Sequence, residues 1–201
     1  MANRLRRGHG RWRLNVTLST RFGERRSRAA WGGVPREAPG TYRRFARIAS
    51  MQMLPDLQGR VALVTGAARR TGRVIATKLA AAGASVLVNA MSSRAEAEAL
   101  VADIEREHGA GRAMAHIADV SDPQAVRAMV AACVERFGGL DILVNNASIR
   151  LHAALDATTP EQWRRVLQVT LDGSFYCAQA AAPHLSRSGQ GVVIKIGRAH
   201  V

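Results

Sequence analysis

The segment TGAARRTG occupies residues 65–72, between an apolar run and an alanine-rich run. A glycine at the end of a strand permits a tight turn, and the first amide groups of a following helix can bind a pyrophosphate. Gly66 and Gly72 suit these roles, although the pattern differs from G-x-G-x-x-G. Arg69 and Arg70 place two guanidinium groups beside the turn, which favours a ligand with extra negative charge. Because many α/β proteins need such a glycine for steric reasons alone, the turn requires support from other residues.

A second polar segment, NAMSSR at residues 89–94, supplies part of that support. A site that prefers NAD places Asp or Glu about 20 residues after the glycine turn, where it binds the ribose 2′-hydroxyl. No acid stands in this segment, and Ser92, Ser93 and Arg94 are hydrogen-bond donors suited to a 2′-phosphate. An ordinary polar loop is the alternative interpretation. Together the two segments predict NADP(H) as the cofactor, in preference to NAD(H).

Strand-like and helix-like patterns alternate through the rest of the chain. Strands are expected over residues 60–65, 84–89, 112–118, 141–144 and 192–194, and helices over residues 71–82, 93–108, 121–137 and 159–185. Such alternation with short connections predicts right-handed crossovers. The expected fold class is α/β, with a doubly wound parallel sheet of Rossmann type and three α/β/α layers. We expect one domain, over residues 51–195.

The formal net charge of +14 is concentrated at the start of the chain. Residues 1–50 hold 13 Arg and two acids, so residues 51–201 carry only +3. We expect residues 1–50 to be a disordered basic extension that precedes the true start at Met51 or Met53. A transit peptide and a nucleic-acid-binding arm are the alternatives. Because the rest of the chain is close to neutral, no nucleic-acid partner is expected. No apolar run approaches the roughly 18 residues that span a bilayer, so no membrane partner is expected either.

The two cysteines, Cys133 and Cys177, lack metal-ligand spacing and fall in alanine-rich helical runs. A disulfide framework needs more cysteines than these two. We therefore predict no metal site, two small buried thiols, and a cytoplasmic location.

Three motifs together resemble the short-chain dehydrogenase/reductase family. They are TGAARRTG, ADV at residues 118–120 and NNAS at residues 145–148, in the family's order and spacing. Arg70 replaces the middle glycine of the first motif, a variant similar to that of pteridine reductases and some 3-ketoacyl reductases. The resemblance implies adenine contacts at Asp119, in the Asp-Val pair with Val120. It also implies that Asn145 supports the central sheet and that Ala147 lies beside the cofactor ribose.

The chain departs from the family pattern in its second half. Thr170 stands where the family usually has a catalytic Asn, and the family's catalytic Ser and Tyr-x-x-x-Lys do not occur, so the catalytic residues are unknown. Residues 196–201 resemble a translated sequencing adapter, which predicts an artefactual tail on a fragment truncated after the fifth strand. The fragment is then expected to be inactive, and His152 and His184 are expected to be structural rather than catalytic substitutes.

The function predicted for the parent protein is that of an NADP(H)-dependent oxidoreductase. It would reduce a carbonyl, or oxidise an alcohol, of a small substrate, and the chain would contain its cofactor-binding part. The resemblance further implies a homodimer or homotetramer that uses the long helix from about Glu161. A non-catalytic NADP-sensing protein is the alternative. A nucleotide-dependent methyltransferase would normally need an acid after the second strand, and that acid is missing.

Overall fold

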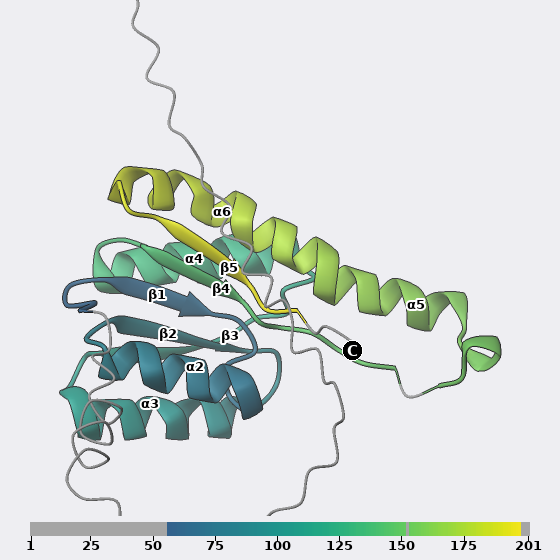
Figure 1. Cartoon of the computed structure of the whole chain (residues 1–201), viewed down its shortest axis with the longest axis horizontal. Coiled ribbons are helices and arrows are strands. Elements are labelled where there is room, and N and C mark those ends of the chain that lie inside the picture. The colour runs from purple at the N-terminus through teal and green to yellow at the C-terminus, as the bar shows by residue number, and fades with distance from the viewer. Residues whose placement is uncertain (1–55, 152, 198–201) are drawn as a thin grey trace, which may run out of the picture. The chain divides into compact units, whose positions relative to one another are not determined.

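The computed structural model of the chain describes residues 56–151 and 153–197 (Figure 1). The expected basic extension, His152 and residues 198–201 of the expected artefactual tail lie outside the described residues.

Five parallel strands form one sheet in the order β3-β2-β1-β4-β5. The strands are β1 (Val61–Val64), β2 (Ser85–Ala90), β3 (Ala113–Ile117), β4 (Ile142–Asn145) and β5 (Val192–Lys195). All residues of β1 and β4 are buried, as expected for continuous apolar runs in a sheet that is covered on both faces. In register, Leu63 of β1 lies between Leu87 of β2 and Leu143 of β4. The predicted parallel sheet is confirmed.

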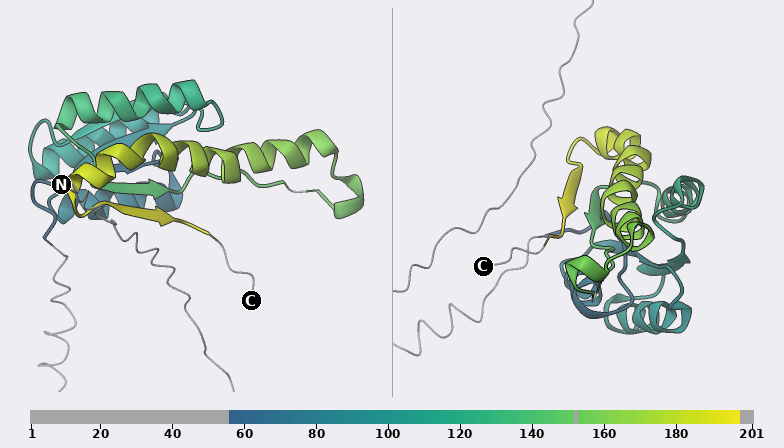
Figure 2. Two further views of the ribbon diagram at one scale, coloured as in Figure 1. Left: turned by 90° about the horizontal axis from the view of Figure 1, so that it is seen from above. Right: turned by 90° about the vertical axis from the view of Figure 1, so that its right-hand side faces the viewer.

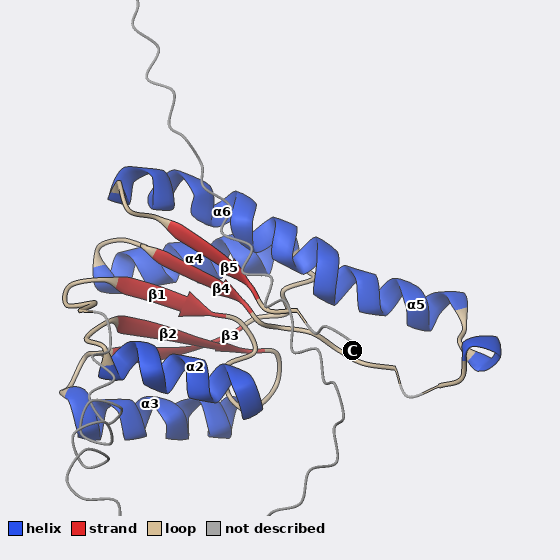
Figure 3. Cartoon of the chain, viewed as in Figure 1, coloured by secondary structure: helices blue, strands red, loops and turns tan. Residues whose placement is uncertain are grey.

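Helices cover the two faces of this sheet and complete three α/β/α layers (Figures 2 and 3). Helices α2 (Arg70–Ala81) and α3 (Arg94–His108) bury their inner residues in one core cluster with Val64, Val86 and Val88. Helices α4 (Pro123–Phe137) and α6 (Gly173–Ser188) do so in a second cluster with Leu63, Leu87 and Leu143. Because side chains alternate along a strand, neighbouring residues feed the two clusters in turn. The predicted Rossmann-type, doubly wound architecture is confirmed.

The prediction of one continuous helix over residues 159–185 is wrong in one respect. Helix α5 (Pro160–Leu167) begins at a capping box formed by Thr159 and Gln162. A π-helical segment, η2 (Gln168–Asp172), separates α5 from α6. Such segments often occur at functional sites. A short 3₁₀ turn, η1 (Leu155–Ala157), precedes α5. No helix in the described ranges is long and apolar enough to cross a membrane.

Cys133 of α4 and Cys177 of α6 are both buried in the second core cluster. Burial raises the pKa of each thiol to about 12, since the thiolate would be poorly solvated there. Both side chains are therefore packing residues, with thiols that stay protonated at neutral pH.

The amino-terminal edge of the sheet is held by Asp141, which precedes β4. Its carboxylate accepts hydrogen bonds from the Val61 amide at 2.8 Å, the Arg60 guanidinium at 3.0 Å and the Ser188 hydroxyl at 2.6 Å. Burial favours a higher pKa for Asp141, but these hydrogen bonds outweigh it and hold the pKa below its ordinary value. One carboxylate thus joins β1, β4 and the end of α6.

We expect Asp141→Asn to lower the free energy of unfolding at pH 7 by about 1–3 kcal/mol, because a charged acceptor with three donors is lost. A group with a depressed folded pKa stabilises the protein above its unfolded pKa, and this stabilisation disappears as the pH falls through the folded pKa. The difference between the wild-type chain and the variant should therefore shrink below about pH 4. Urea unfolding at several pH values measures it.

The matched control is Asp156→Asn, because Asp156 is exposed on the turn η1. That variant should unfold like the wild-type chain at every pH. An equal loss of stability in both variants would contradict the role given to Asp141.

Candidate functional site

A cleft of about 720 Å³ lies at the carboxyl ends of the strands. Ligands of open α/β sheets bind at this edge. Seven of the eleven residues predicted to bind the cofactor line the cleft: Gly66, Arg69, Arg70, Gly72, Asp119, Val120 and Ala147. The other four, Ser92, Ser93, Arg94 and Asn145, do not belong to its lining.

The turn between β1 and α2 requires glycine at two positions. Gly66 has φ +59°, and a Cβ atom on it would lie 3.1 Å from the Ala147 Cα atom. A Cβ atom on Gly72 would lie 2.3 Å from the Gly66 carbonyl oxygen and 2.6 Å from Asn146 Nδ2. The two Gly72 distances are shorter than real Cβ contacts allow, so the start of α2 packs directly onto the turn, and the Gly66 distance is tighter than most such contacts. A ligand in the cleft can consequently approach the backbone closely.

Hydrogen bonds from β4 hold this turn in place. The Thr65 hydroxyl donates to the Val144 carbonyl at 3.3 Å and accepts from the amides of Asn146 and Ala147, each at 3.0 Å. Asn146 Nδ2 donates to the carbonyls of Thr65 at 2.9 Å and Gly66 at 3.0 Å. The ends of β1 and β4 are thus fastened to each other beneath the cleft.

The end of β2 contributes Asn89, which is 1% exposed. Its Oδ1 accepts from the Gly66 amide at 3.2 Å, and its Nδ2 donates to the Ala118 carbonyl at 3.0 Å. The sequence interpretation included neither Asn89 nor Asn146 as a site residue. Their signal was an amide side chain one residue before the end of, or directly after, a buried strand, where a polar group needs a partner.

Helix α2 presents an uncapped amino terminus to the cleft. Its N-cap residue, Arg69, makes no side-chain capping bond, and its first turn contains no acid. The first amide groups of the helix can therefore bind an anion. Arg70 has φ +50°, a left-handed conformation that costs a non-glycine residue about 1–2 kcal/mol. Strained residues of this kind often occur at ligand sites.

The charged side chains around this terminus are partly paired. Arg69 forms an ion pair with Glu96 of α3, and Arg94 pairs with Glu98 at 3.4 Å. Arg150, which the sequence interpretation did not select, also lines the cleft. Ser93 is the N-cap residue of α3 but makes no capping hydrogen bond.

The remaining predicted residues lie on β4 and in η2. Asn145 is buried, and its Nδ2 donates to the Ser174 carbonyl of α6 at 3.3 Å. Thr170 lies in η2, and its hydroxyl is buried without a hydrogen-bond partner among the described residues. Its carbonyl accepts from the Ser174 hydroxyl at 2.7 Å. The segment that carries Thr170 thus adjoins the polar end of β4.

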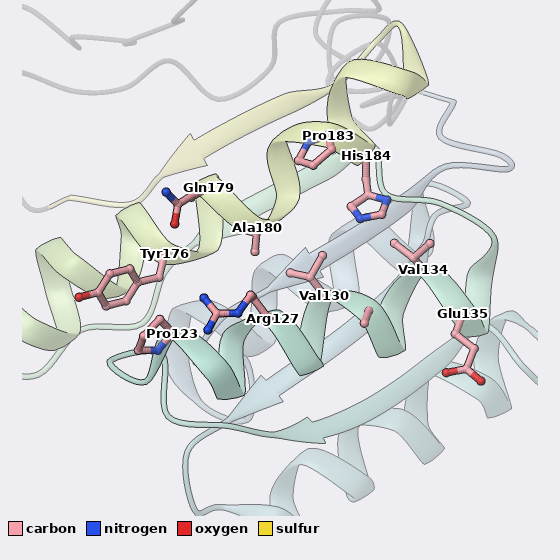
Figure 4. A pocket seen from close by; sticks show the side chains of 11 residues that line it. Pro123, Arg127, Val130, Val134, Glu135, Tyr176, Gln179, Ala180, Pro183 and His184 are labelled. Atoms are coloured by element: carbon pink, nitrogen blue, oxygen red, sulfur yellow. The ribbon is translucent and has the colours of Figure 1, made fainter.

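A second cleft, also of about 720 Å³, lies between α4 and α6 (Figure 4). His184, Tyr176 and Ala180 of α6 border it opposite Val130 and Val134 of α4, as Figure 4 shows. None of the residues predicted to bind the cofactor lines this cleft. We therefore assign the candidate site to the cleft at the strand ends, where glycines, arginines and an uncapped helix terminus meet.

Metal binding has no candidate within the described ranges, because they contain no suitable group of three or more His, Cys, Asp or Glu side chains. The donors of the cleft at the strand ends are backbone amides and guanidinium groups, which bind phosphate oxygens rather than metal ions. This donor set fits the phosphates of a dinucleotide.

Comparison with known proteins agrees with this geometry. A 3-oxoacyl-(acyl-carrier-protein) reductase FabG of Staphylococcus aureus is 40% identical over 135 residues, which are 67% of this chain and 54% of the relative. An uncharacterized oxidoreductase of Methylorubrum extorquens is 44% identical over 136 residues, which are 68% of this chain and 54% of that protein. The chain thus spans about half the length of the curated relatives it matches.

A solved structure gives the same result. The crystal structure of a short chain dehydrogenase from Burkholderia cenocepacia, in complex with NADP, superposes with a TM-score of 0.67 and 43% identity. The match covers 72% of this chain and 57% of that one. The sequence model of the short chain dehydrogenase family matches residues 60–199. With the motifs at the strand ends and the fold in agreement, the chain belongs to the short-chain dehydrogenase/reductase family.

Proposed function

We propose that the described residues bind NADP(H), in preference to NAD(H), for an oxidoreductase that acts on a carbonyl or alcohol group. The observation that carries the proposal is the uncapped terminus of α2, which meets the turn at Gly66 and Gly72 beside Arg69. Bound NADP in the related Burkholderia cenocepacia structure supports it. The reductases among the relatives favour an enzyme over a non-catalytic NADP sensor.

The residues of the cleft suggest where each part of the dinucleotide lies. The first amides of α2 would bind the pyrophosphate, with Arg70 and Arg150 offsetting its charge. Arg69 would bind the 2′-phosphate. Ser92, Ser93 and Arg94 lie outside the cleft lining, at the start of α3. They remain proposed as additional donors to that phosphate.

The remaining parts of the dinucleotide would follow the strand ends. Asp119 and Val120 would contact the adenine ring, and Ala147 would lie beside a ribose. Asn145 would support the sheet beneath. When bound, the nicotinamide ring gives or accepts the hydride. Thr170 would occupy the position of the family's Asn, where its buried hydroxyl can hold a proton acceptor or donor in place.

Replacing Arg69 tests the assignment of the 2′-phosphate. We expect Arg69→Gln to weaken NADPH binding about 10-fold to 100-fold, because a charge-assisted hydrogen bond to phosphate is lost. NADH lacks that phosphate and should bind the variant as it binds the wild-type chain. Quenching of protein fluorescence on titration of each cofactor measures both affinities. Equal losses for NADPH and NADH would place Arg69 at the pyrophosphate instead.

Glu96 should act in the opposite direction. Because its carboxylate pairs with Arg69, it competes with a 2′-phosphate for the same guanidinium group. We expect Glu96→Gln to bind NADPH a few-fold more tightly and NADH no differently. Glu107→Gln is the matched control, since Glu107 is an exposed acid on the same helix whose basic neighbours are Arg106 and His108. Unchanged NADPH affinity in Glu96→Gln would contradict this competition.

We also propose that the protein is a homo-oligomer, a dimer or tetramer, that buries exposed apolar side chains of α5, η2 and α6. Trp163, Leu171 and Phe175 are more than half exposed along these elements. Contiguous exposed apolar surface on a soluble domain often marks an interface. The cleft between α4 and α6 adjoins the last of them (Figure 4).

A charge among these apolar side chains should disrupt the assembly. We expect Phe175→Glu to reduce the mass in solution to that of one chain, because a buried unpaired carboxylate is unfavourable. Light scattering coupled to size-exclusion chromatography measures the mass. Val74→Glu is the control, since Val74 is equally exposed but lies on α2. A wild-type chain that is already monomeric would contradict the proposal.

A further inference from the structure

Arg165 of α5 reaches the ends of β2 and β3 with a forked set of hydrogen bonds. Its Nη1 donates to the Ser121 hydroxyl at 2.7 Å, and its Nη2 donates to Asp119 Oδ2 at 2.7 Å. Nη2 also lies 3.6 Å from the Met91 sulfur atom. A planar guanidinium group is suited to such two-pronged contacts, because its donors diverge at fixed angles.

Few other contacts tie α5 to the rest of the fold. The helix buries none of its residues fully and lies beyond the carboxyl ends of the strands (Figure 1). Within residues 56–151 and 153–197, every hydrogen bond from an α5 side chain to another secondary-structure region comes from Arg165. Arg165 and Asp119 therefore fix each other's position.

The Asp119 carboxylate accepts three hydrogen bonds through its two oxygen atoms. Its Oδ1 accepts from the Ser121 amide at 2.9 Å and the Ser121 hydroxyl at 2.8 Å. Within residues 56–151 and 153–197, its Oδ2 accepts from Arg165 alone. A carboxylate has about four acceptor positions, so none of these residues fills the remaining position on Oδ2. Asp119 and Met91 both line the cleft at the strand ends, so a ligand in the cleft would lie beside the Asp119 residue.

The charge state of Asp119 suits an acceptor. Burial favours a higher pKa, but hydrogen bonds from Arg165 and Ser121 outweigh it and hold the pKa of Asp119 below its ordinary value. The carboxylate stays ionised at neutral pH and accepts hydrogen bonds without donating any. It would attract an amino group of a ligand and repel a carbonyl oxygen.

We propose that Arg165 is a positioning residue that fixes the Asp119 carboxylate as the acceptor for the amino group of an adenine ring, and thereby sets the preference for adenine over a 6-oxopurine. This inference rests on the proposed binding of NADP(H). Adenine carries a donor at its 6-position, whereas hypoxanthine carries a carbonyl oxygen there. The guanidinium group itself lies outside the cleft lining and acts through Asp119.

The test compares the affinities of the chain for NADPH and for its hypoxanthine analogue. We expect the wild-type chain to prefer NADPH about tenfold, the effect of one hydrogen bond to a charged acceptor. Arg165→Met keeps the apolar stem but cannot donate, and the preference should fall to about twofold or less. Arg165→Lys should recover only part of it, since an ammonium group lacks the fork.

Arg164→Met is the matched control, because Arg164 is the adjacent arginine and its carboxylate neighbour is the exposed Glu161 at 3.7 Å. This variant should retain the full preference. If Arg165→Met weakens both nucleotides equally, Arg165 has only a structural role and the inference is overturned. If Arg165→Met does not fold, Ser121→Ala decides, because it removes the hydroxyl that bridges Arg165 and Asp119. That variant should also reduce the preference.

The same titration separates this inference from the proposed function. A wild-type chain that binds neither nucleotide refutes the proposed function, and the inference with it. A wild-type chain that binds both nucleotides, with a preference that no variant changes, refutes the inference alone.

Discussion

The Thr65 hydroxyl joins the carboxyl ends of β1 and β4, and the geometry of the candidate site depends on that junction. It accepts two amide hydrogen bonds from the chain after β4, while Asn146 returns two to the turn after β1. Asn89 holds the same turn from β2. Because the side chains of Thr65, Asn89 and Asn146 all have hydrogen-bond partners at this junction, the turn keeps one conformation. The amino terminus of α2 is thereby directed into the cleft without needing a side-chain cap of its own.

The fold was largely predictable because its signals are local. Continuous apolar runs indicate strands that are buried on both faces, and glycine and proline punctuate the helices between them. The strand and helix ends differ from expectation by one to three residues, because helix and strand ends fray. The π-helical segment η2 was not predictable in this way. It is accompanied by close contact of Gly173 with Val120, where a Cβ atom would lie 2.8 Å from Val120 Cγ2, and such a contact between distant segments leaves no periodic pattern.

The site was predictable only in part, for a related reason. Strand ends and family motifs single out Gly66, Gly72 and Asp119 as candidate site residues in the sequence. Asn146 reaches Thr65 across 81 positions of sequence, and Arg165 reaches Asp119 across 46. Hydrogen bonds over such separations exist only once the sheet has formed. Ser92, Ser93 and Arg94 show that a position after a strand is not sufficient. These residues follow β2 as the pattern requires, but they lie at the start of α3, outside the cleft lining.

Charge balance explains why arginine abundance alone says little about the ligand. Several arginines of the described region are paired with acids: Arg60 with Asp141, Arg73 with Asp103, and Arg165 with Asp119. These pairs fasten elements of the fold together and contribute little net field. Among the arginines that line the cleft, Arg69 has a carboxylate partner, whereas Arg70 and Arg150 have none within the described part of the chain. A pyrophosphate near Arg70 and Arg150 would meet uncompensated positive charge, but a phosphate at Arg69 would first have to displace Glu96. The proposed preference for a 2′-phosphate would therefore depend on a competition between two anions for the Arg69 guanidinium group, and not on the number of arginines nearby.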